Sequence, residues 1–192
     1  MSQRKKSQLK RIALVSATIS LVNDDGFHAA SMSKIAKLAG VVPGTIYLYF
    51  QNKQDLINQV YLDVKKEFTT FAFENYTSSN SVQDDFELIW KRIAQFKLTH
   101  LDKALFLHQC DITPMLDEES RQEGIKHLQP LLNLWIKGQQ EGLIKPLSPF
   151  LLYAYSIFPL SFLTHSKKRG VCEISEEDLE QTYQAAWDSI KL

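Results

Sequence analysis

Apolar residues recur along the whole chain at three- and four-residue spacing, which is the period of an amphipathic helix. The first such stripe contains Leu14, Val15, Thr18, Leu21 and Val22. No stretch alternates with the two-residue period of a half-buried strand. The pattern therefore predicts an all-α fold.

Local signals divide the first quarter of the chain into short helices. The first helix is predicted over residues 7–23 and should end at Gly26, because glycine tolerates the left-handed conformation that commonly follows a helix. Ser31 is a favourable cap for a second helix, and Gly40 suits the left-handed position after that helix. Pro43 then begins a third helix, since a missing N–H costs nothing in the first turn.

The rest of the chain is predicted to be helical as well. The third helix reaches Tyr49 or Phe50, and Asn52 caps a fourth, with Asp55 three residues later in an arrangement close to a capping box. Later helices are predicted at 82–100, 102–113, 118–141, 149–166 and 176–191. We place a domain boundary between residues 54 and 55, so that the two domains are 1–54 and 55–192.

Charge is distributed unevenly, although the 192 residues include 22 basic and 22 acidic side chains. Residues 1–55 contain eight basic and three acidic residues, a net charge of +5, and residues 56–192 carry −5. A basic segment joined to an acidic remainder favours a polyanionic partner for the first part. A solvated helix face with a chance surplus of charge would give the same numbers.

Two short helices joined by residues 39–42 match a helix-turn-helix. The second of them begins with small residues, which would let it enter the major groove of DNA, where Thr45 could contact a base edge. Tyr47 and Tyr49 could donate to phosphate oxygens, and Lys53 adds charge where a helix N-terminus already favours anions.

Each of these residues also has a purely structural interpretation. Tyr47 and Tyr49 could pack against the core, and Lys53 could be solvated. Ile46 and Phe50 are expected to be core residues.

Residues 26–27, 31–41 and 44–56 resemble the N-terminal domain of the TetR (tetracycline-repressor) family. The resemblance implies an all-helical homodimer with a three-helix DNA-binding head and a larger C-terminal domain that binds a small ligand and the second subunit. Val42 departs from the family, which often has a serine there, and so do Leu48 and Tyr49, where many relatives carry tyrosine and histidine. The DNA-binding residues that we predict are Ser33, Lys34, Pro43, Gly44, Thr45, Tyr47, Tyr49 and Lys53.

The C-terminal part is rich in aromatic residues, which at helical spacing normally form a core. Pro130 and Pro159 fall inside otherwise helical stretches, however, and a helix kinked by proline leaves gaps that a ligand can fill. We therefore predict a mostly apolar pocket for a small-molecule effector, lined by some of Trp90, Phe96, Phe106, His108, Trp135 and Tyr153.

The last two predicted helices are candidates for the homodimer interface. Each carries an apolar stripe, and two such helices from each subunit make a four-helix bundle that closes a two-fold dimer. The same stripes could instead cover the core of their own domain. The interface residues that we predict are Tyr155, Phe158, Phe162, Tyr183, Trp187 and Ile190.

Catalysis, cofactors and metal sites are not expected. His108 and Cys110 are two residues apart and so diverge on a helix, and the chain contains no HExxH, GxSxG or glycine-rich phosphate loop. The basic start is not followed by the apolar segment of a secretory signal. The longest apolar stretch, 150–163, is shorter than the roughly 20 residues that span a bilayer, so we expect a cytoplasmic protein without a membrane partner.

These observations together predict a ligand-responsive regulator of transcription. It would bind a palindromic site in double-stranded DNA as a homodimer, act as a repressor and be released by a small, mostly apolar effector. The alternative is a helical small-molecule-binding or scaffold protein without operator-specific DNA binding.

Overall fold

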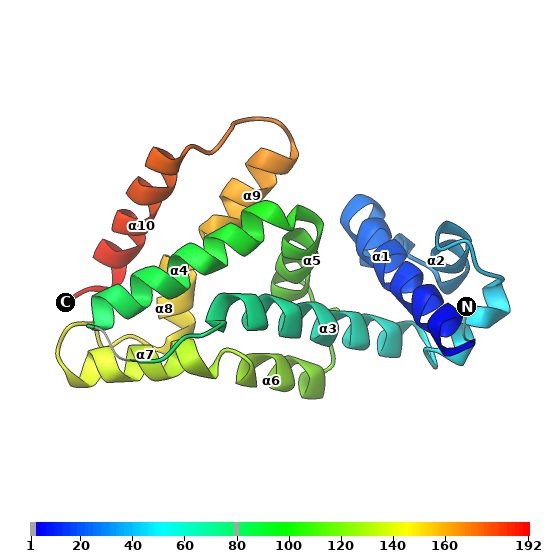
Figure 1. Ribbon diagram of the computed structural model, residues 1–192, viewed down its shortest axis with the longest axis horizontal. Coiled ribbons are helices and arrows are strands. Elements are labelled where there is room, and N and C mark those ends of the chain that lie inside the picture. Colours follow the sequence, from blue (N-terminus) through cyan, green and yellow to red (C-terminus); the bar gives the residue numbers. More distant parts are fainter. Residues whose placement is uncertain (1–2, 79–80) are drawn as a thin grey trace. The chain divides into compact units, whose positions relative to one another are not determined.

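The computed structural model describes residues 3–78 and 81–192, and in this part of the chain all regular structure is helical (Figure 1). This confirms the predicted all-α fold. The elements in chain order are α1 (Gln3–Ala29), α2 (Met32–Leu38), the 3₁₀-helix η1 (Pro43–Leu48), α3 (Lys53–Phe73), α4 (Val82–Thr99), α5 (Leu101–Ile112), α6 (Glu118–Lys126), α7 (Gln129–Gln140), α8 (Pro149–Ser156), α9 (Leu160–Lys168) and α10 (Glu176–Ile190).

The chain forms two compact units. The first consists of Met1–Val64 and Leu105–Gly124, and the second of Lys65–Ala104 and Ile125–Leu192. Three helices, α3, α5 and α6, therefore contribute residues to both units. The predicted division between residues 54 and 55 falls in the first turn of α3, and this assignment of domains stays a prediction.

In the first unit, α1 packs on α2, and α2 packs on η1. The core under these elements is apolar and fully closed: Leu14, Ile35, Ile46 and Phe50 are at most 1% exposed. The cap predicted at Ser31 is confirmed, since its hydroxyl accepts from the backbone N–H of Lys34 at 3.3 Å. This bond satisfies one of the N–H groups that a helix start leaves without a partner.

Two glycines set the direction of the chain in this unit. The helical run of α1 extends to Ala29, but its geometry is interrupted at Gly26, with φ 79° and ψ 166°, where the sequence predicts its end. Gly40 follows α2 with φ 67°, which confirms the left-handed turn. Residues other than glycine rarely adopt a backbone conformation with positive φ.

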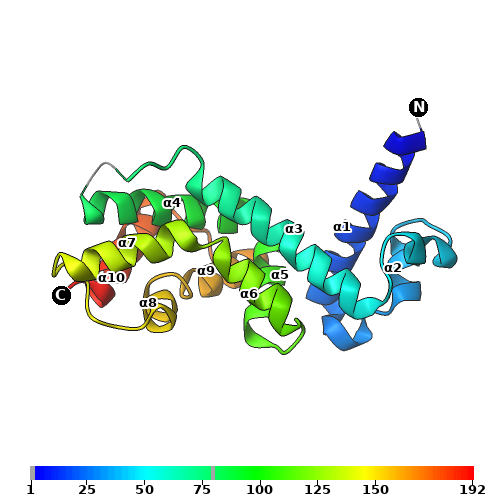
Figure 2. The same ribbon diagram turned by 90° about the horizontal axis from the view of Figure 1, so that it is seen from below.

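In the second unit, α4 packs against α7, α9 and α10, and α8 packs against α7 and α10 (Figures 1 and 2). The large aromatic side chains Phe86, Trp90 and Trp135 are at most 1% exposed in this bundle. Trp90 also donates from Nε1 to the carbonyl of Ser156 at 2.8 Å, which ties α4 to the end of α8.

The prediction of two long helices that run through prolines is wrong, because the structure divides each of these regions into two helices. The region 118–141 forms α6 and α7, with Pro130 in the first turn of α7. The region 149–166 forms α8 and α9, with Pro159 as the cap of α9. Proline lacks the N–H and its ring clashes with the preceding turn, so here it begins a new helix rather than bending a continuous one.

Candidate nucleic-acid interface

The recognition segment is η1, a six-residue 3₁₀-helix that ends at Leu48. No side chain caps it, since Val42 stands at the cap position and has no hydroxyl. The amide of Thr45 instead donates to the carbonyl of Val42 at 2.7 Å, and that of Tyr49 to the carbonyl of Ile46 at 3.0 Å. The tighter helix differs from the helix to Tyr49 or Phe50 that the sequence predicts.

Exposure divides this segment into an anchor and an outer surface. Ile46 is completely buried and Phe50 is 1% exposed, as predicted. Tyr47 is 58% exposed and Leu48 is 81% exposed. Pro43 and Gly44 are also exposed and Thr45 is half-buried, so the predicted contact residues of η1 lie on the solvent side of one apolar anchor.

Ser33 and Lys34 lie exposed in the first turns of α2. The ammonium of Lys34 is 3.8 Å from the carboxylate of Asp25, a loose contact between exposed groups that holds the side chain weakly. Both residues are therefore available to a partner.

Lys53 has a structural role that the sequence did not reveal. Its Nζ donates to the carbonyl of His28 at 3.2 Å and lies 4.4 Å from the ring centre of Phe27. The side chain is partly buried, and desolvation lowers the pKa of Lys53 below its usual value. Lys53 thus fastens the start of α3 to the end of α1, while the ammonium keeps two further hydrogens for other acceptors.

Tyr49 is half-buried at the end of η1, and its hydroxyl lies 3.0 Å from Oγ of Ser7 on α1. Beside it is a hollow of about 640 Å³, lined by Tyr49 together with Arg4, Ser7, Gln8 and Arg11. In the sequence the two arginines stand out only as part of the basic segment. Their spacing of three, four and seven residues with Ser7 and Gln8 was the signal that could have placed all four on one helix face.

The six predicted effector residues do not all belong to one unit. Trp90, Phe96, Trp135 and Tyr153 lie in the second unit, whereas Phe106 and His108 lie in the first. Phe96 is 1% exposed and contacts the rings of Phe68, Phe71 and His100. No hydrogen-bond acceptor lies near Nε1 of Trp135 among the described residues.

The six predicted dimer residues separate by exposure. Tyr155 and Phe162 are 56% and 74% exposed, and Phe158 is partly exposed. Tyr183, Trp187 and Ile190 are buried in the second unit, where the ring of Phe86 lies 6.3 Å from Tyr183 and 5.7 Å from Trp187. The stripe of α10 therefore packs on the core of its own unit, and the assignment of these three residues to a dimer interface stays a prediction.

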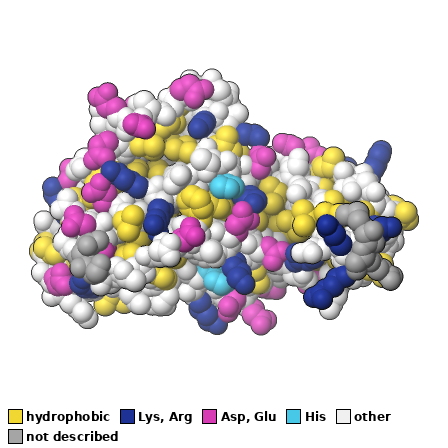
Figure 3. Space-filling view, in the orientation of Figure 1, with side chains coloured by type: hydrophobic (Ala, Val, Ile, Leu, Met, Phe, Trp, Pro, Cys, Tyr) yellow, Lys and Arg dark blue, Asp and Glu magenta, His cyan; other side chains and the backbone are white. Residues whose placement is uncertain are grey.

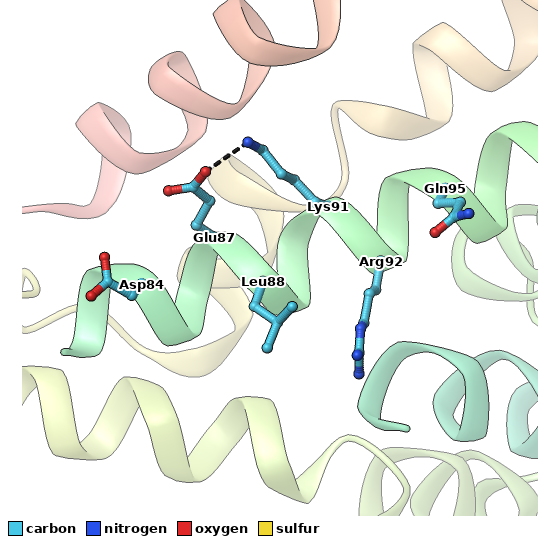
Figure 4. A pocket seen from close by; sticks show the side chains of 6 residues that line it. All are labelled: Asp84, Glu87, Leu88, Lys91, Arg92 and Gln95. Carbon is cyan, nitrogen blue, oxygen red and sulfur yellow. Dashed lines mark hydrogen bonds and ion pairs between the residues drawn. The ribbon is translucent and has the colours of Figure 1, made fainter. Parts of the chain in front are cut away.

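A second hollow, of about 350 Å³, runs along α4 (Figure 4). Charged side chains of both signs line it, and the ammonium of Lys91 bridges Glu87 at 2.6 Å and Glu180 at 2.9 Å. These carboxylates raise the pKa of Lys91. The cation is thus already matched by two anions, and its main effect is to join α4 to α10.

No group of three or more His, Cys, Asp or Glu side chains that could hold a metal ion occurs in residues 3–78 and 81–192. Among the helices described, none combines the length and the apolar character that crossing a membrane requires.

Comparison with known proteins agrees with the architecture of both parts of the chain. Residues 14–60 match the family described as bacterial regulatory proteins, tetR family. Residues 81–191 match the family described as tetracyclin repressor-like, C-terminal domain.

Individual relatives extend the similarity to nearly the whole chain. A solved TetR family transcription regulator from Marinobacter aquaeolei VT8 is 28% identical, with a TM-score of 0.87 over 100% of this chain and 99% of that one. The fatty acid metabolism regulator protein of Bacillus subtilis is 31% identical over 70% of this chain and 64% of its own length. The solved FadR regulator from Bacillus subtilis, in complex with stearoyl-CoA, is 21% identical with a TM-score of 0.68 over 92% and 95% of the two chains. The chain belongs to the TetR family of bacterial regulatory proteins and is a helix-turn-helix transcriptional regulator.

Proposed function

We propose that the protein is a homodimeric repressor that binds a palindromic operator and is released by a small, mostly apolar effector. The observation that carries the proposal is the outer surface of η1, where Thr45 and the largely exposed Tyr47 stand on the buried anchor Ile46. An aromatic ring that is 58% exposed on a short helix gains little for the fold. A groove of DNA would give that ring a partner.

The proposed contacts follow from the chemistry of each side chain. Thr45 offers a hydroxyl and a methyl group to base edges, and the small residues Pro43 and Gly44 allow the segment to approach them closely. Tyr47 and Tyr49 donate to phosphate oxygens, which fixes the register of the protein on the duplex. Further phosphate contacts at the edges of this surface would come from Ser33, Lys34 and Lys53.

A dimer is supported by the exposed aromatic side chains of α8 and α9. Tyr155 and Phe162 are large and mostly exposed, and an apolar surface of this kind commonly marks an interface. A two-fold dimer would present its recognition segments about 34–36 Å apart, one turn of DNA. Replacing Phe162 by glutamate should therefore give a monomer in light scattering and weaken operator binding, whereas Gln140→Glu, at an exposed position of α7, should leave the dimer intact.

The effector is proposed to be a molecule with a long apolar part that binds in the second unit. Support comes from the relative named as a fatty acid metabolism regulator and from the FadR regulator that was solved with stearoyl-CoA. Around the buried Trp90, Phe96 and Trp135 and the half-buried Tyr153, an effector would replace packing contacts of the core. An effector that prefers a different conformation of the dimer weakens DNA binding by its differential affinity, typically about 1–3 kcal/mol.

Selection of genomic DNA fragments by the full-length protein, followed by sequencing, tests the proposal. We expect enrichment of a palindromic sequence, and fluorescence anisotropy should then show weaker binding to it in the presence of long-chain fatty acids or their CoA esters. Absence of any enriched sequence would overturn the proposal and favour a helical small-molecule-binding or scaffold protein.

A further inference from the structure

The start of α1 and the end of η1 line the open 640 Å³ hollow on the surface of the first unit. Arg4, Ser7, Gln8 and Arg11 reach it from one face of α1, and Tyr49 reaches it from the end of the recognition segment. The contact between the hydroxyls of Ser7 and Tyr49 joins the two sides. Any molecule that fills this hollow therefore touches the helix-turn-helix directly.

The surroundings of the hollow are strongly basic. Five of the first eleven residues are Lys or Arg, and the first acidic residue of the chain is Asp24. Arg4, Lys5, Lys6 and Lys10 are exposed, and none of them forms an ion pair with a described residue. Figure 3 shows Lys and Arg side chains gathered around this end of α1.

Arg11 forms an oriented part of the lining. Its Nη1 lies 2.7 Å from the carboxylate of Asp63, and its guanidinium lies 5.7 Å from the ring centre of Phe50. Asp63 thus fixes the side chain and compensates much of its charge. The uncompensated positive charge at the hollow comes from Arg4, while Arg11 and the hydroxyls offer directed donors.

We propose that this hollow holds the sugar–phosphate backbone of the DNA duplex whose bases face η1. Every polar group named in its lining can donate: a guanidinium binds two phosphate oxygens at once, and the hydroxyls of Ser7 and Tyr49 and the amide of Gln8 supply single hydrogen bonds. The volume suits a stretch of backbone rather than one small ion. The proposal rests on the proposed DNA-binding function and adds to it a phosphate clamp from α1, in which Arg4 is the main charge.

Salt-dependent binding of the full-length protein to its selected duplex tests the clamp. Each lost phosphate contact reduces the slope of log affinity against log salt by about 0.9. For Arg4→Gln we therefore expect a slope smaller by roughly 1.8 for a dimer and binding roughly tenfold weaker at low salt. The matched control is Arg169→Gln, the loss of an exposed arginine at the end of α9, which should change neither quantity.

Ethylation of individual DNA phosphates gives a second, positional readout. In the unaltered protein, ethylation of a phosphate flanking the recognised bases should block binding, and this single effect should vanish for Arg4→Gln while the other blocked phosphates persist. If Arg4→Gln and Arg169→Gln have the same slope and the same ethylation pattern as the unaltered protein, the clamp is overturned and the proposed function stands. If the unaltered protein selects no duplex, both fail. Equal binding of duplex RNA with the same dependence on Arg4 would overturn DNA as the occupant.

Discussion

Replacing Ile46 by alanine should detach the recognition segment while the rest of the protein stays folded. Ile46 is completely buried, and it is the only residue of η1 that is buried. Alanine lacks three of its carbon atoms, whose transfer from water contributes about 2.4 kcal/mol at about 0.8 kcal/mol for each. The cavity that remains adds to this loss, so we expect a total of roughly 3–4 kcal/mol.

This loss of packing free energy is larger than the stability that a single 3₁₀-turn has by itself. The free energy of local opening of η1 should therefore fall before that of global unfolding. Hydrogen exchange measures this directly, because the amide of Thr45 donates to the carbonyl of Val42, and those of Tyr49 and Phe50 donate to the carbonyl of Ile46. We expect these amides to exchange faster by roughly two to three orders of magnitude, and the affinity for DNA to fall with them.

Leu48→Ala is the matched control, since it also removes three carbon atoms but from a side chain that is 81% exposed. Its effect on exchange should stay within roughly threefold, as for most surface substitutions. Unchanged exchange in Ile46→Ala would refute the anchor role of this residue. Uniform acceleration over the whole chain would refute the local nature of the opening.

Three further predictions concern other contacts. Lys53→Ala should weaken binding to all DNA sequences and flatten the salt dependence of that binding. The variant should also lower the free energy of unfolding by about 1 kcal/mol, because the contacts of Lys53 with the carbonyl of His28 and the ring of Phe27 are lost. An unchanged salt slope in fluorescence anisotropy would remove Lys53 from the DNA-contact residues. Gly124→Ala should destabilise the protein by about 1–3 kcal/mol in urea denaturation, since a Cβ there would lie 2.0 Å from Oη of the buried Tyr61, whereas the exposed Gln122→Ala should have little effect. Burial, followed by the charge of a nearby glutamate, raises the pKa of Tyr183 from 10.0 to about 12. The stability that the protonated Tyr183 contributes should therefore be complete below pH 10 and be lost as the pH rises through 12. Denaturation of the Tyr183→Phe variant should not show this alkaline loss of stability.

The parts of the fold that the sequence predicts best are those fixed by one or two neighbouring residues. Ser31 caps α2 through a hydroxyl three residues from the amide that it binds, and Gly40 supplies the only backbone conformation that the turn accepts at low cost. The structure also shows a device of the same local kind at the start of α10, where Ser175 and Asp178 form a reciprocal capping box. Each device is local, so its presence can be inferred without knowledge of the rest of the chain.

Periodicity predicts that a helix has an apolar face, but not what covers that face. The stripe of α10 suits a partner subunit as well as its own core, and only the fold brings Phe86, far away in sequence, against Tyr183 and Trp187. For the same reason the sequence predicts only a solvated or a DNA-binding role for Lys53. Its contacts with Phe27 and His28 depend on the position of α1 in the folded unit.

The weakness of η1 as a helix makes the surrounding packing part of its function. A 3₁₀-helix of six residues without a side-chain cap has little stability of its own, so the positions of Thr45 and Tyr47 depend on Ile46 below and on the contact of Tyr49 with Ser7 at its end. DNA that occupies the hollow beside Tyr49 would touch Ser7 and Tyr49, the two residues whose contact orients η1. Phosphate binding at Arg4 and base contact at Thr45 should then be energetically coupled. A double-mutant cycle of Arg4→Gln and Thr45→Val on operator affinity should give a coupling free energy above the roughly 0.5 kcal/mol that independent sites show, and strict additivity would separate the two contacts.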